Sequence, residues 1–397
     1  MSYVVEKERC TGCGACMVAC PVSAITLDDE PDGFGHAAIN DDMCIHCNRC
    51  KSVCQVLNPP ELRSQEAVYA AQSPSSEVLL TSASGGAFFE LARTFLRDGG
   101  TVYGAAMHVN HSIAQIIHEG ATNESALRLQ QGSKYAMGAA YPVFSEVRRA
   151  LEAKERVLFS GLPCQVAALR CYLGRDYDGL VTVDIFCHGN TSERHFNLYL
   201  SYLARKHHQE IVGYVFRDKS RGVGYKPNLM LANGKIVRMT ALQEAYWYLF
   251  QNSKFFRDSC YSCPYSCEQR VGDISVGDFW GIEKERPELL TSGGGPIDAT
   301  KGVSAVLANT PKGKELIGAS NLVLEECKIA NVAASGEAVR NPQPMPEDRD
   351  VVLDLFRKGD YAKIKRYSIR QMGASYLVDL IYDTKAVQLL RKLLGRA

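Results

Sequence analysis

Residues 10–20 read CTGCGACMVAC, and residues 44–54 read CIHCNRCKSVC. The two runs carry eight of the fifteen cysteines of this 397-residue chain in one pattern, Cys-x2-Cys-x2-Cys-x3-Cys. Each cysteine of the second run stands 34 positions after its counterpart in the first, as Cys44 does after Cys10. Unrelated cysteines would not keep one spacing at every position, so the two runs are copies of one ligand-bearing motif.

The spacing of the runs is typical of [4Fe-4S] ligation. Three thiolates two residues apart surround one face of a cubane, and the fourth thiolate of each run reaches the neighbouring cluster in two-cluster ferredoxins. The runs therefore predict two clusters with crossed fourth ligands. The expected ligand sets are Cys10, Cys13, Cys16, Cys54 and Cys44, Cys47, Cys50, Cys20.

Two other uses of these cysteines are possible in principle. Zinc also accepts four thiolates, but zinc sites usually show two separated pairs rather than runs of four. A disulfide framework suits a short secreted chain, and nothing resembling a signal peptide precedes Cys10. The segment resembles bacterial-type double-cluster ferredoxins, with one departure: Gln55 stands where the second run usually carries proline.

Composition limits the class of protein. The chain is 46% hydrophobic and 22% charged, with a formal net charge of +1, so no basic excess points to nucleic acid. No uninterrupted apolar run approaches the length of a membrane span. Fifteen cysteines without an export signal indicate metal ligation in a reducing compartment, and we expect a cytoplasmic protein.

The remaining chain predicts three units. Pro59-Pro60 closes a small α+β ferredoxin-like domain at residues 1–60. Short apolar strands then alternate with amphipathic helices through residue 340, which predicts an α/β (mixed α+β) body. Residues 341–397 begin with a proline-spaced linker and continue as a helical C-terminal tail. Its apolar and basic stripes, which include Leu377, Leu390 and Arg391, fit docking on its own body or a second subunit, or peripheral contact with a membrane surface.

Two small polar loops each precede a predicted helix. The first is Ser84-Gly85-Gly86, and the second is Gly132-Ser133-Lys134-Tyr135. Backbone N–H groups at such a position can hold a phosphate, and a lysine can neutralise a diphosphate. A plain turn is the alternative for the first loop, and a solvated side chain is the alternative for Lys134.

Two predicted strands, at residues 157–161 and 180–186, end in loops that carry Cys164 and Cys187. The carboxyl ends of strands form the binding edge of an open α/β sheet, so both thiols can face one site. Cys260 and Cys263 form a Cys-x2-Cys turn that could complete it. The alternative is that Cys164 and Cys187 are buried apolar residues, while Cys260, Cys263 and Cys267 hold zinc.

A resemblance favours the cluster. The two small loops, together with five further motifs, resemble the beta subunit of coenzyme F420-reducing hydrogenase and its relatives over roughly residues 65–330. These motifs are Gly-Leu-Pro-Cys-Gln at 161–165, Cys-His-Gly at 187–189, Phe-Arg-Asp-Lys at 216–219, Cys-x2-Cys at 260–263 and Gly-Asp-Ile-Ser-Val-Gly-Asp-Phe-Trp-Gly at 272–281. The resemblance implies a flavin-binding body, with FAD held by the loops at 84–86 and 132–135. It also implies a third [4Fe-4S] cluster on Cys164, Cys187, Cys260 and Cys263, although Cys267 could replace one ligand.

The expected function follows from these cofactors. Clusters pass single electrons, whereas a flavin can also take or give a hydride. We predict an oxidoreductase that links an external carrier such as ferredoxin to a small-molecule substrate, which is F420 or a metabolite of a pathway such as surface-polysaccharide synthesis. The candidate catalytic residues are His188 and Lys134, with Arg217 and Lys219 as further contacts. The alternative is a non-catalytic electron-relay subunit that docks on a partner enzyme, and self-association of the chain is left open.

Overall fold

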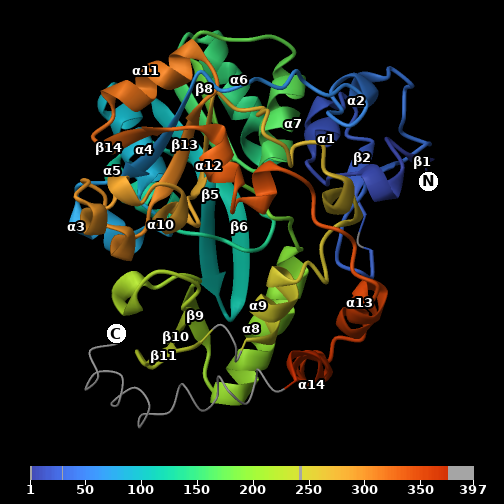
Figure 1. The fold of residues 1–397 in the computed structure, drawn as a ribbon. Helices are drawn as coiled ribbons and strands as arrows, with labels where there is room; N and C mark the ends of the chain where they lie inside the picture. Colours follow the sequence, from blue (N-terminus) through green and yellow to red (C-terminus); the bar gives the residue numbers. More distant parts are fainter. Residues whose placement is uncertain (1, 29, 241–243, 374–397) are drawn as a thin grey trace.

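A computed structural model describes residues 2–28, 30–240 and 244–373 (Figure 1). Its centre is an eight-stranded sheet in the order β14-β4-β13-β12-β8-β7-β5-β6. The strands are β4 (Ala67–Gln72), β5 (Thr101–Asn110), β6 (Ile113–Ala121), β7 (Val157–Gly161), β8 (Leu180–Ile185), β12 (Ile274–Asp278), β13 (Ser304–Ala308) and β14 (Val323–Cys327). The strands expected from short apolar runs near residues 68, 101, 157 and 180 are thus confirmed.

The four central strands, β5, β7, β8 and β12, run parallel to one another. The outer pairings, including β5 with β6 and β12 with β13, are antiparallel. Parallel strands bring their carboxyl ends to one edge of the sheet. The segments after β7, β8 and β12 therefore emerge side by side; Cys164 lies in the first turn of the helix after β7, and Cys187 lies in the loop after β8.

Helices cover both faces of this sheet (Figure 1). Apolar side chains of α4 (Ala87–Arg97) and α11 (Pro311–Ala319) pack on one face, together with those of the short α3 (Ser76–Thr81) and α5 (Glu124–Gln130). The other face is covered by α6 (Phe144–Glu152) and α7 (Pro163–Leu173), and farther along by α10 (Ile282–Glu285) and α12 (Ile329–Ala333). Because both faces are covered, most residues of β7, β8 and β12 are buried whichever face they point to, including the polar Thr182, Asp184 and Ser275.

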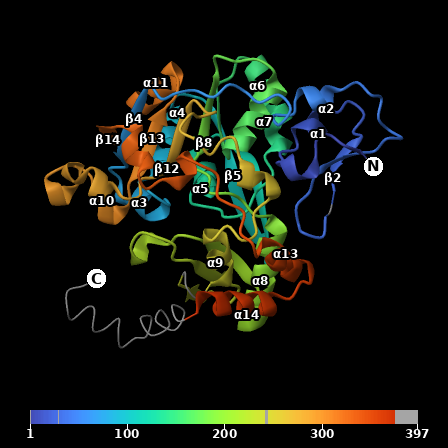
Figure 2. The ribbon, with the colours of Figure 1, turned by 45° about the vertical axis from the view of Figure 1, so that its right-hand side comes forward.

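The N-terminal module lies beside α6 and α7 (Figures 1 and 2). It contains a three-stranded antiparallel sheet and two helices of about one turn each. These elements are β1 (Ser2–Tyr3), β2 (Ile25–Leu27), β3 (Ala37–Ile39), α1 (Ala15–Ala19) and α2 (Arg49–Ser52). Each helix contains the third cysteine of its run and ends shortly before the fourth, so the two copies of the motif have similar local structure.

A second lobe lies below the large sheet in Figure 1. It combines the antiparallel strands β9 (Ile211–Val215), β10 (Asn228–Leu231) and β11 (Ile236–Arg238) with α8 (Glu193–His207) and α9 (Ala245–Gln251). Aromatic rings fill its core, and the rings of Tyr199 and Tyr246 stack with their centres 5.5 Å apart. The hairpin of β10 and β11, which the Asn233-Gly234 turn predicts, is confirmed.

The described part of the C-terminal tail forms α13 (Arg349–Arg357) and α14 (Tyr361–Met372). Apolar side chains of both helices, such as Phe356 and Ile364, are buried in the core of the second lobe. Residues 349–372 therefore dock on the body of their own chain (Figure 2). The apolar and basic stripe of residues 377–396, for which membrane contact was an alternative, lies outside the described residues.

The fold is α/β, with one large mixed sheet and a helical C-terminal region, as predicted. The boundaries at residues 60 and 340 stay predictions. Among the residues that the structure describes, no helix combines the length and apolar character that a membrane span requires.

Candidate metal centres

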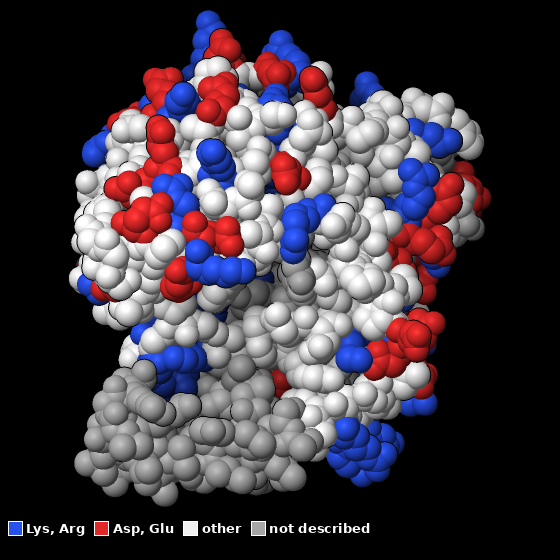
Figure 3. All heavy atoms as spheres, in the orientation of Figure 1, with Lys and Arg blue, Asp and Glu red and all other residues white. Residues whose placement is uncertain are grey.

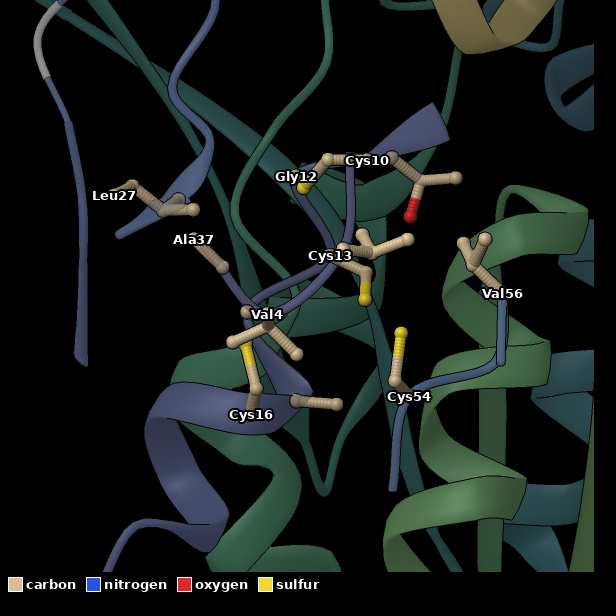
Figure 4. A pocket seen from close by; sticks show the side chains of 13 residues that line it. Val4, Cys10, Gly12, Cys13, Cys16, Leu27, Ala37, Cys54 and Val56 are labelled. Carbon is tan, nitrogen blue, oxygen red and sulfur yellow. The ribbon is translucent and has the colours of Figure 1, made fainter. Parts of the chain in front are cut away.

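The first candidate centre is a cavity of about 350 Å³ lined by Cys10, Cys13, Cys16 and Cys54. Figure 4 shows three of these thiols on the loop and helix of the first run, and the fourth, Cys54, facing them from the end of the second. Apolar side chains complete the lining, among them Val4, Val5, Leu27, Ala37 and Val56. Cys54, which the spacing predicts as the crossed fourth ligand, thus lines the same cavity as the first three cysteines.

The cysteines of the second set lie nearer the surface. Cys44, Cys47 and Cys50 are close enough that the first two raise the pKa of Cys50, in addition to the larger effect of burial. Cys47 is exposed. Cys20 lies at the C-terminal end of α1, where its sulfur accepts a hydrogen bond from the Ala24 N–H at 3.2 Å.

Gln55, which replaces the usual proline, connects the module to the body. Its amide donates to Thr11 Oγ1 at 3.0 Å, and its carbonyl accepts a hydrogen bond from the Tyr265 hydroxyl. Gln55 is buried. Proline could make neither contact, so the departure from the ferredoxin pattern serves an interface that a free ferredoxin lacks.

The third candidate centre is a cavity of about 520 Å³ lined by Cys164, Cys187, Cys260 and Cys263. Cys164 lies in the first turn of α7, directly after β7, and Cys187 follows β8. Cys260 and Cys263 come from the 3-10 helix Asp258–Ser262 and the residue after it. The four thiols singled out from strand ends and a Cys-x2-Cys turn are therefore brought together.

Burial and crowding control the protonation of these thiols. Burial, followed by the nearness of Cys260 and Cys263, raises the pKa of Cys187 to about 12. Burial, followed by the three other thiols, raises the pKa of Cys164 well above its usual range. The raised pKa values of Cys164 and Cys187 favour their thiol forms at neutral pH, so a metal that binds them as thiolates must displace their protons. The donor set fits a four-thiolate iron–sulfur cluster.

Two buried arginines hold the loop that carries Cys260 and Cys263. Arg270 Nη2 lies 2.6 Å from Asp184 Oδ1, and Arg270 Nη1 donates to the Tyr265 carbonyl at 3.0 Å. Arg349 of α13 donates to the Phe256 carbonyl at 2.9 Å and pairs with Asp258 at 3.0 Å. Neither arginine is predictable from the sequence, because a single arginine carries no spacing signal.

The other cysteines have separate environments. The Cys267 thiol donates to the carbonyls of Gln269 at 3.1 Å and Pro264 at 3.4 Å. The described residues that line the third cavity do not include Cys267. Cys171 donates to the Asn58 carbonyl at 3.2 Å. Cys327 ends β14.

The loop Ser84-Gly85-Gly86 precedes α4, as predicted. A side chain at Gly85 would come within 2.4 Å of the Ala71 carbonyl, and Gly86 has a φ of 80°, so both positions favour glycine. Lys219 reaches this loop from beyond β9, and its ammonium donates to the Ser84 carbonyl at 2.5 Å. Lys219 is only 7% exposed and has no carboxylate ion-pair partner among the described residues.

The second loop, residues 132–135, follows α5 and contacts the segment that leads from β9 to Lys219. The Lys134 ammonium donates to carbonyls at the C-terminal end of α5, including those of Gln130 at 2.9 Å and Gln131 at 3.0 Å. The Tyr135 ring packs edge-on against Phe216, with the centres 5.4 Å apart. Arg217, the next residue, makes a bidentate ion pair with Asp278, at 2.6 and 3.2 Å.

His188 follows the third-site residue Cys187. Its Nε2 lies 3.3 Å from both the Gln251 carbonyl and Ser253 Oγ, and its ring meets that of Phe256 edge-on. His188 is half-buried beside Cys187 of the third cavity. Its contacts with Gln251, Ser253 and Phe256 are separate from those of the Ser84 loop. The two candidate catalytic residues thus belong to different parts of the site.

Charged side chains are interspersed on the face that Figure 3 displays. Lys and Arg alternate with Asp and Glu there, as the near-zero net charge suggests. On that face the described residues form no large area of one sign. Recognition of a partner there would depend on shape and individual contacts rather than on a broad electrostatic field.

Comparison with known proteins gives two domain matches. Residues 9–57 match the 4Fe-4S dicluster domain, and residues 154–331 match the family of the C terminus of the coenzyme F420 hydrogenase/dehydrogenase beta subunit. Together with the cysteine cavities, these matches define an iron–sulfur electron-transfer protein of the oxidoreductase type. Residues 154–331 of the chain are thus similar to the C-terminal part of coenzyme F420 hydrogenase/dehydrogenase beta subunits.

Individual relatives extend the comparison. The chain is 21% identical to an F420H2 dehydrogenase component of Methanosarcina mazei, the subunit named F, over 347 residues, which cover 80% of this chain and 90% of that protein. It is 36% identical over 72 residues to acetyl-CoA decarbonylase/synthase complex subunit alpha 1 of Methanosarcina barkeri, covering 15% and 8% of the two chains. A chain of the F420-reducing [NiFe] hydrogenase complex from Methanosarcina barkeri aligns with a TM-score of 0.43 and 18% identity, over 79% of this chain and 94% of that one.

Proposed function

We propose that the protein passes electrons between an external one-electron carrier and a small molecule bound over an FAD, through three [4Fe-4S] clusters. One observation carries the proposal: Thr11 lines both the first and the third cysteine cavity. A cluster on Cys10, Cys13, Cys16 and Cys54 would therefore adjoin one on Cys164, Cys187, Cys260 and Cys263. When bound, such clusters carry single electrons and a flavin exchanges hydrides.

The order of the sites follows from exposure. The second cysteine set includes the exposed Cys47 and is bordered by exposed apolar side chains, Met43, Ile45 and Leu57. We assign this set to exchange with the external carrier, such as a ferredoxin. The first cavity then lies between the carrier side and the body, and the third cavity lies within the body.

The loop after α5 connects the third cavity with the predicted flavin residues. Met137 lines the third cavity, and its N–H donates to the Thr191 carbonyl at 2.8 Å. Tyr135 is only two residues away and packs against the segment that carries Arg217. This continuity supports a flavin placed between Ser84 and Tyr135, on the body side of the third cavity.

The side chains there fit a dinucleotide. Lys219 is a buried cation without a carboxylate partner in the described chain, and burial lowers its pKa to about 8. A diphosphate would supply the missing negative charge. We assign Ser84, Gly85, Gly86 and Lys219 to the diphosphate, and Gly132, Ser133 and Tyr135 to the remainder of FAD. Trp280, which is 50% exposed, offers an aromatic surface beside Arg217.

Lys134 and His188 receive different roles within this proposal. The Lys134 ammonium is surrounded by backbone carbonyls, so we assign it to ordering the 132–135 loop rather than to proton transfer. His188 lies beside Cys187 and remains a candidate proton donor or acceptor. The similarity of residues 154–331 to coenzyme F420 hydrogenase/dehydrogenase beta subunits supports F420 or another small hydride acceptor as the substrate.

Anaerobic purification followed by iron, sulfide and flavin analysis tests the proposal. We expect about 12 iron atoms, from three four-iron clusters, and one FAD per chain. The purified chain should then oxidise a reduced donor and reduce F420 without a partner protein. A count of about eight iron atoms would contradict the third cluster and the route through it.

The exposure of Cys47 in the second cysteine set also suits a relay subunit of a larger complex. That second function predicts the same iron content but no turnover with any small molecule until a catalytic partner is added. Catalytic turnover by the isolated chain would exclude it.

A further inference from the structure

Arg257 lies between the first and third cysteine cavities. It directly precedes the 3-10 helix that carries Cys260, and it lines the third cavity. Its side chain extends toward the N-terminal module, where Nη1 donates to the Cys10 carbonyl at 3.3 Å and to the Gly35 carbonyl at 3.0 Å. A side chain on Gly12 would come within 2.6 Å of Arg257 Nη2, so the guanidinium packs directly on the first ligand loop.

The charge of Arg257 is unusual for its burial. Four arginines are buried among the described residues, and three of them pair with a carboxylate: Arg217 with Asp278, Arg270 with Asp184, and Arg349 with Asp258. Arg257, which is 7% exposed, has only carbonyl acceptors and the Phe34 ring, 5.0 Å from its guanidinium, within the described chain. A buried charge is costly unless an opposite charge compensates it.

We infer that Arg257 is a positioning residue whose positive charge faces the clusters on both sides and raises the reduction potentials of both. The inference rests on the proposed function, which places a cluster in each cavity. Two four-thiolate sites supply the negative charge that Arg257 otherwise lacks. Because reduction adds negative charge, a nearby cation favours the reduced form, and net charge is a main determinant of cluster potential. One cation then shifts both potentials in the same direction.

A redox titration of the intact holoprotein, followed by electron paramagnetic resonance, tests this role. Arg257→Gln should lower the ratio of reduced to oxidised cluster about tenfold at a given poise, which is about 59 mV for one electron, at both the first and the third cluster. The cluster on Cys44, Cys47, Cys50 and Cys20 should keep its midpoint and serves as the internal reference. Arg257→Lys retains the charge and should recover most of the shift.

A second pair of variants leaves Arg257 in place. Ser259 lines the third cavity and, like Arg257, donates to the Cys10 carbonyl, at 3.3 Å. Ser259→Asp adds a carboxylate beside the guanidinium and should lower both midpoints, whereas Ser259→Asn should not. These variants test the same charge if Arg257→Gln does not retain its iron.

Arg349→Gln is the matched control, because it removes a buried arginine of α13 that contacts the same loop. It should move only the third cluster, because Arg349 contacts Phe256 and Asp258 and not the N-terminal module. Unchanged midpoints in both Arg257→Gln and Ser259→Asp, with about 12 iron atoms present, would overturn the inference. About eight iron atoms in the wild-type protein would instead overturn the proposed function.

Discussion

The two cysteine cavities on either side of Thr11 are built in different ways. In the first, all four cysteines come from within 45 residues of chain, and the neighbouring sheet has strands of only two or three residues. In the third, the cysteines come from the segments after β7 and β8 and from a loop about 70 residues later. The first cavity requires local structure only, whereas the third exists only once the large sheet has formed.

This difference has consequences for stability. A metal centre that joins distant segments contributes its binding free energy to the folding of the whole body. A centre with local ligands contributes mainly to its own module. Loss of the third cluster should therefore weaken the protein more widely than loss of the first.

The largest expected effect comes from removing one ligand at each site. Cys164→Ala should lower the iron content from about 12 to about 8, abolish electron transfer to the flavin and lower the melting temperature of the body. Cys16→Ala should also lower the iron content to about 8 atoms, but it should leave the melting temperature of the body close to that of the wild type. Iron analysis and thermal unfolding measure both.

Cys267→Ala is the control for the ligand set. Because Cys267 bonds to carbonyls of its own loop, this variant should retain about 12 iron atoms. If it loses four while Cys263→Ala retains them, Cys267 is the ligand and the assignment of Cys263 is wrong.

The next effect concerns the support of the third site. Arg270→Met leaves the buried Asp184 carboxylate without its partner and should lower the free energy of unfolding by about 3–5 kcal/mol. The exposed pairs of Arg128 with Glu77 and Glu124 provide the control. Arg128→Met should change the free energy of unfolding by about 0–1 kcal/mol. Denaturant unfolding measures both, and equal effects would contradict a supporting role for Arg270.

A smaller effect separates the two lysines near the proposed flavin. Lys219→Met should weaken FAD binding about tenfold or more, because a charge-assisted hydrogen bond contributes about 1.5–3 kcal/mol. Lys134→Met should mainly lower stability, by about 0.3–1 kcal/mol, as expected for a cation at a helix C-terminus. Fluorescence titration of the flavin-free protein with FAD measures the binding. A larger loss of FAD affinity in Lys134→Met than in Lys219→Met would indicate that Lys134 binds the cofactor.

The smallest effect is a pH dependence at the contact between module and body. His195 Nε2 donates to the Asp32 carbonyl at 2.7 Å, and burial lowers the pKa of His195 to about 3. The folded state thus binds fewer protons than the unfolded state, so this stability is present above pH 6.5 and is lost as pH falls toward 3. Between pH 7 and pH 5.5 the loss should be about 1 kcal/mol. His195→Gln should flatten this slope, and an unchanged slope would assign it to other groups.

The sequence predicted the cysteine runs of the N-terminal module more completely than the third site. The spacing of the runs that begin at Cys10 and Cys44 predicts a ligand set directly, because cysteines that lie close in sequence can reach one cluster only at certain intervals. For the third site, the strand-end rule brought Cys164 and Cys187 together, but spacing alone left zinc as an alternative for Cys260. The family match agrees with the wider assignment of the body.

The supporting residues were beyond prediction. Arg257, Arg270 and Arg349 act through tertiary contacts with segments far away in sequence, and none of them forms a recognisable motif. The role of Gln55 could be suspected only as a departure from a pattern. Its contact with Tyr265 depends on how the module packs against the body.

Electron paramagnetic resonance of the fully reduced holoprotein tests the central claim, an iron–sulfur route from the module into the body, most directly. The account predicts three reduced clusters, with magnetic interaction between the first and third that disappears in Cys164→Ala. Two cluster signals in the wild-type protein, unchanged by Cys164→Ala, would contradict it.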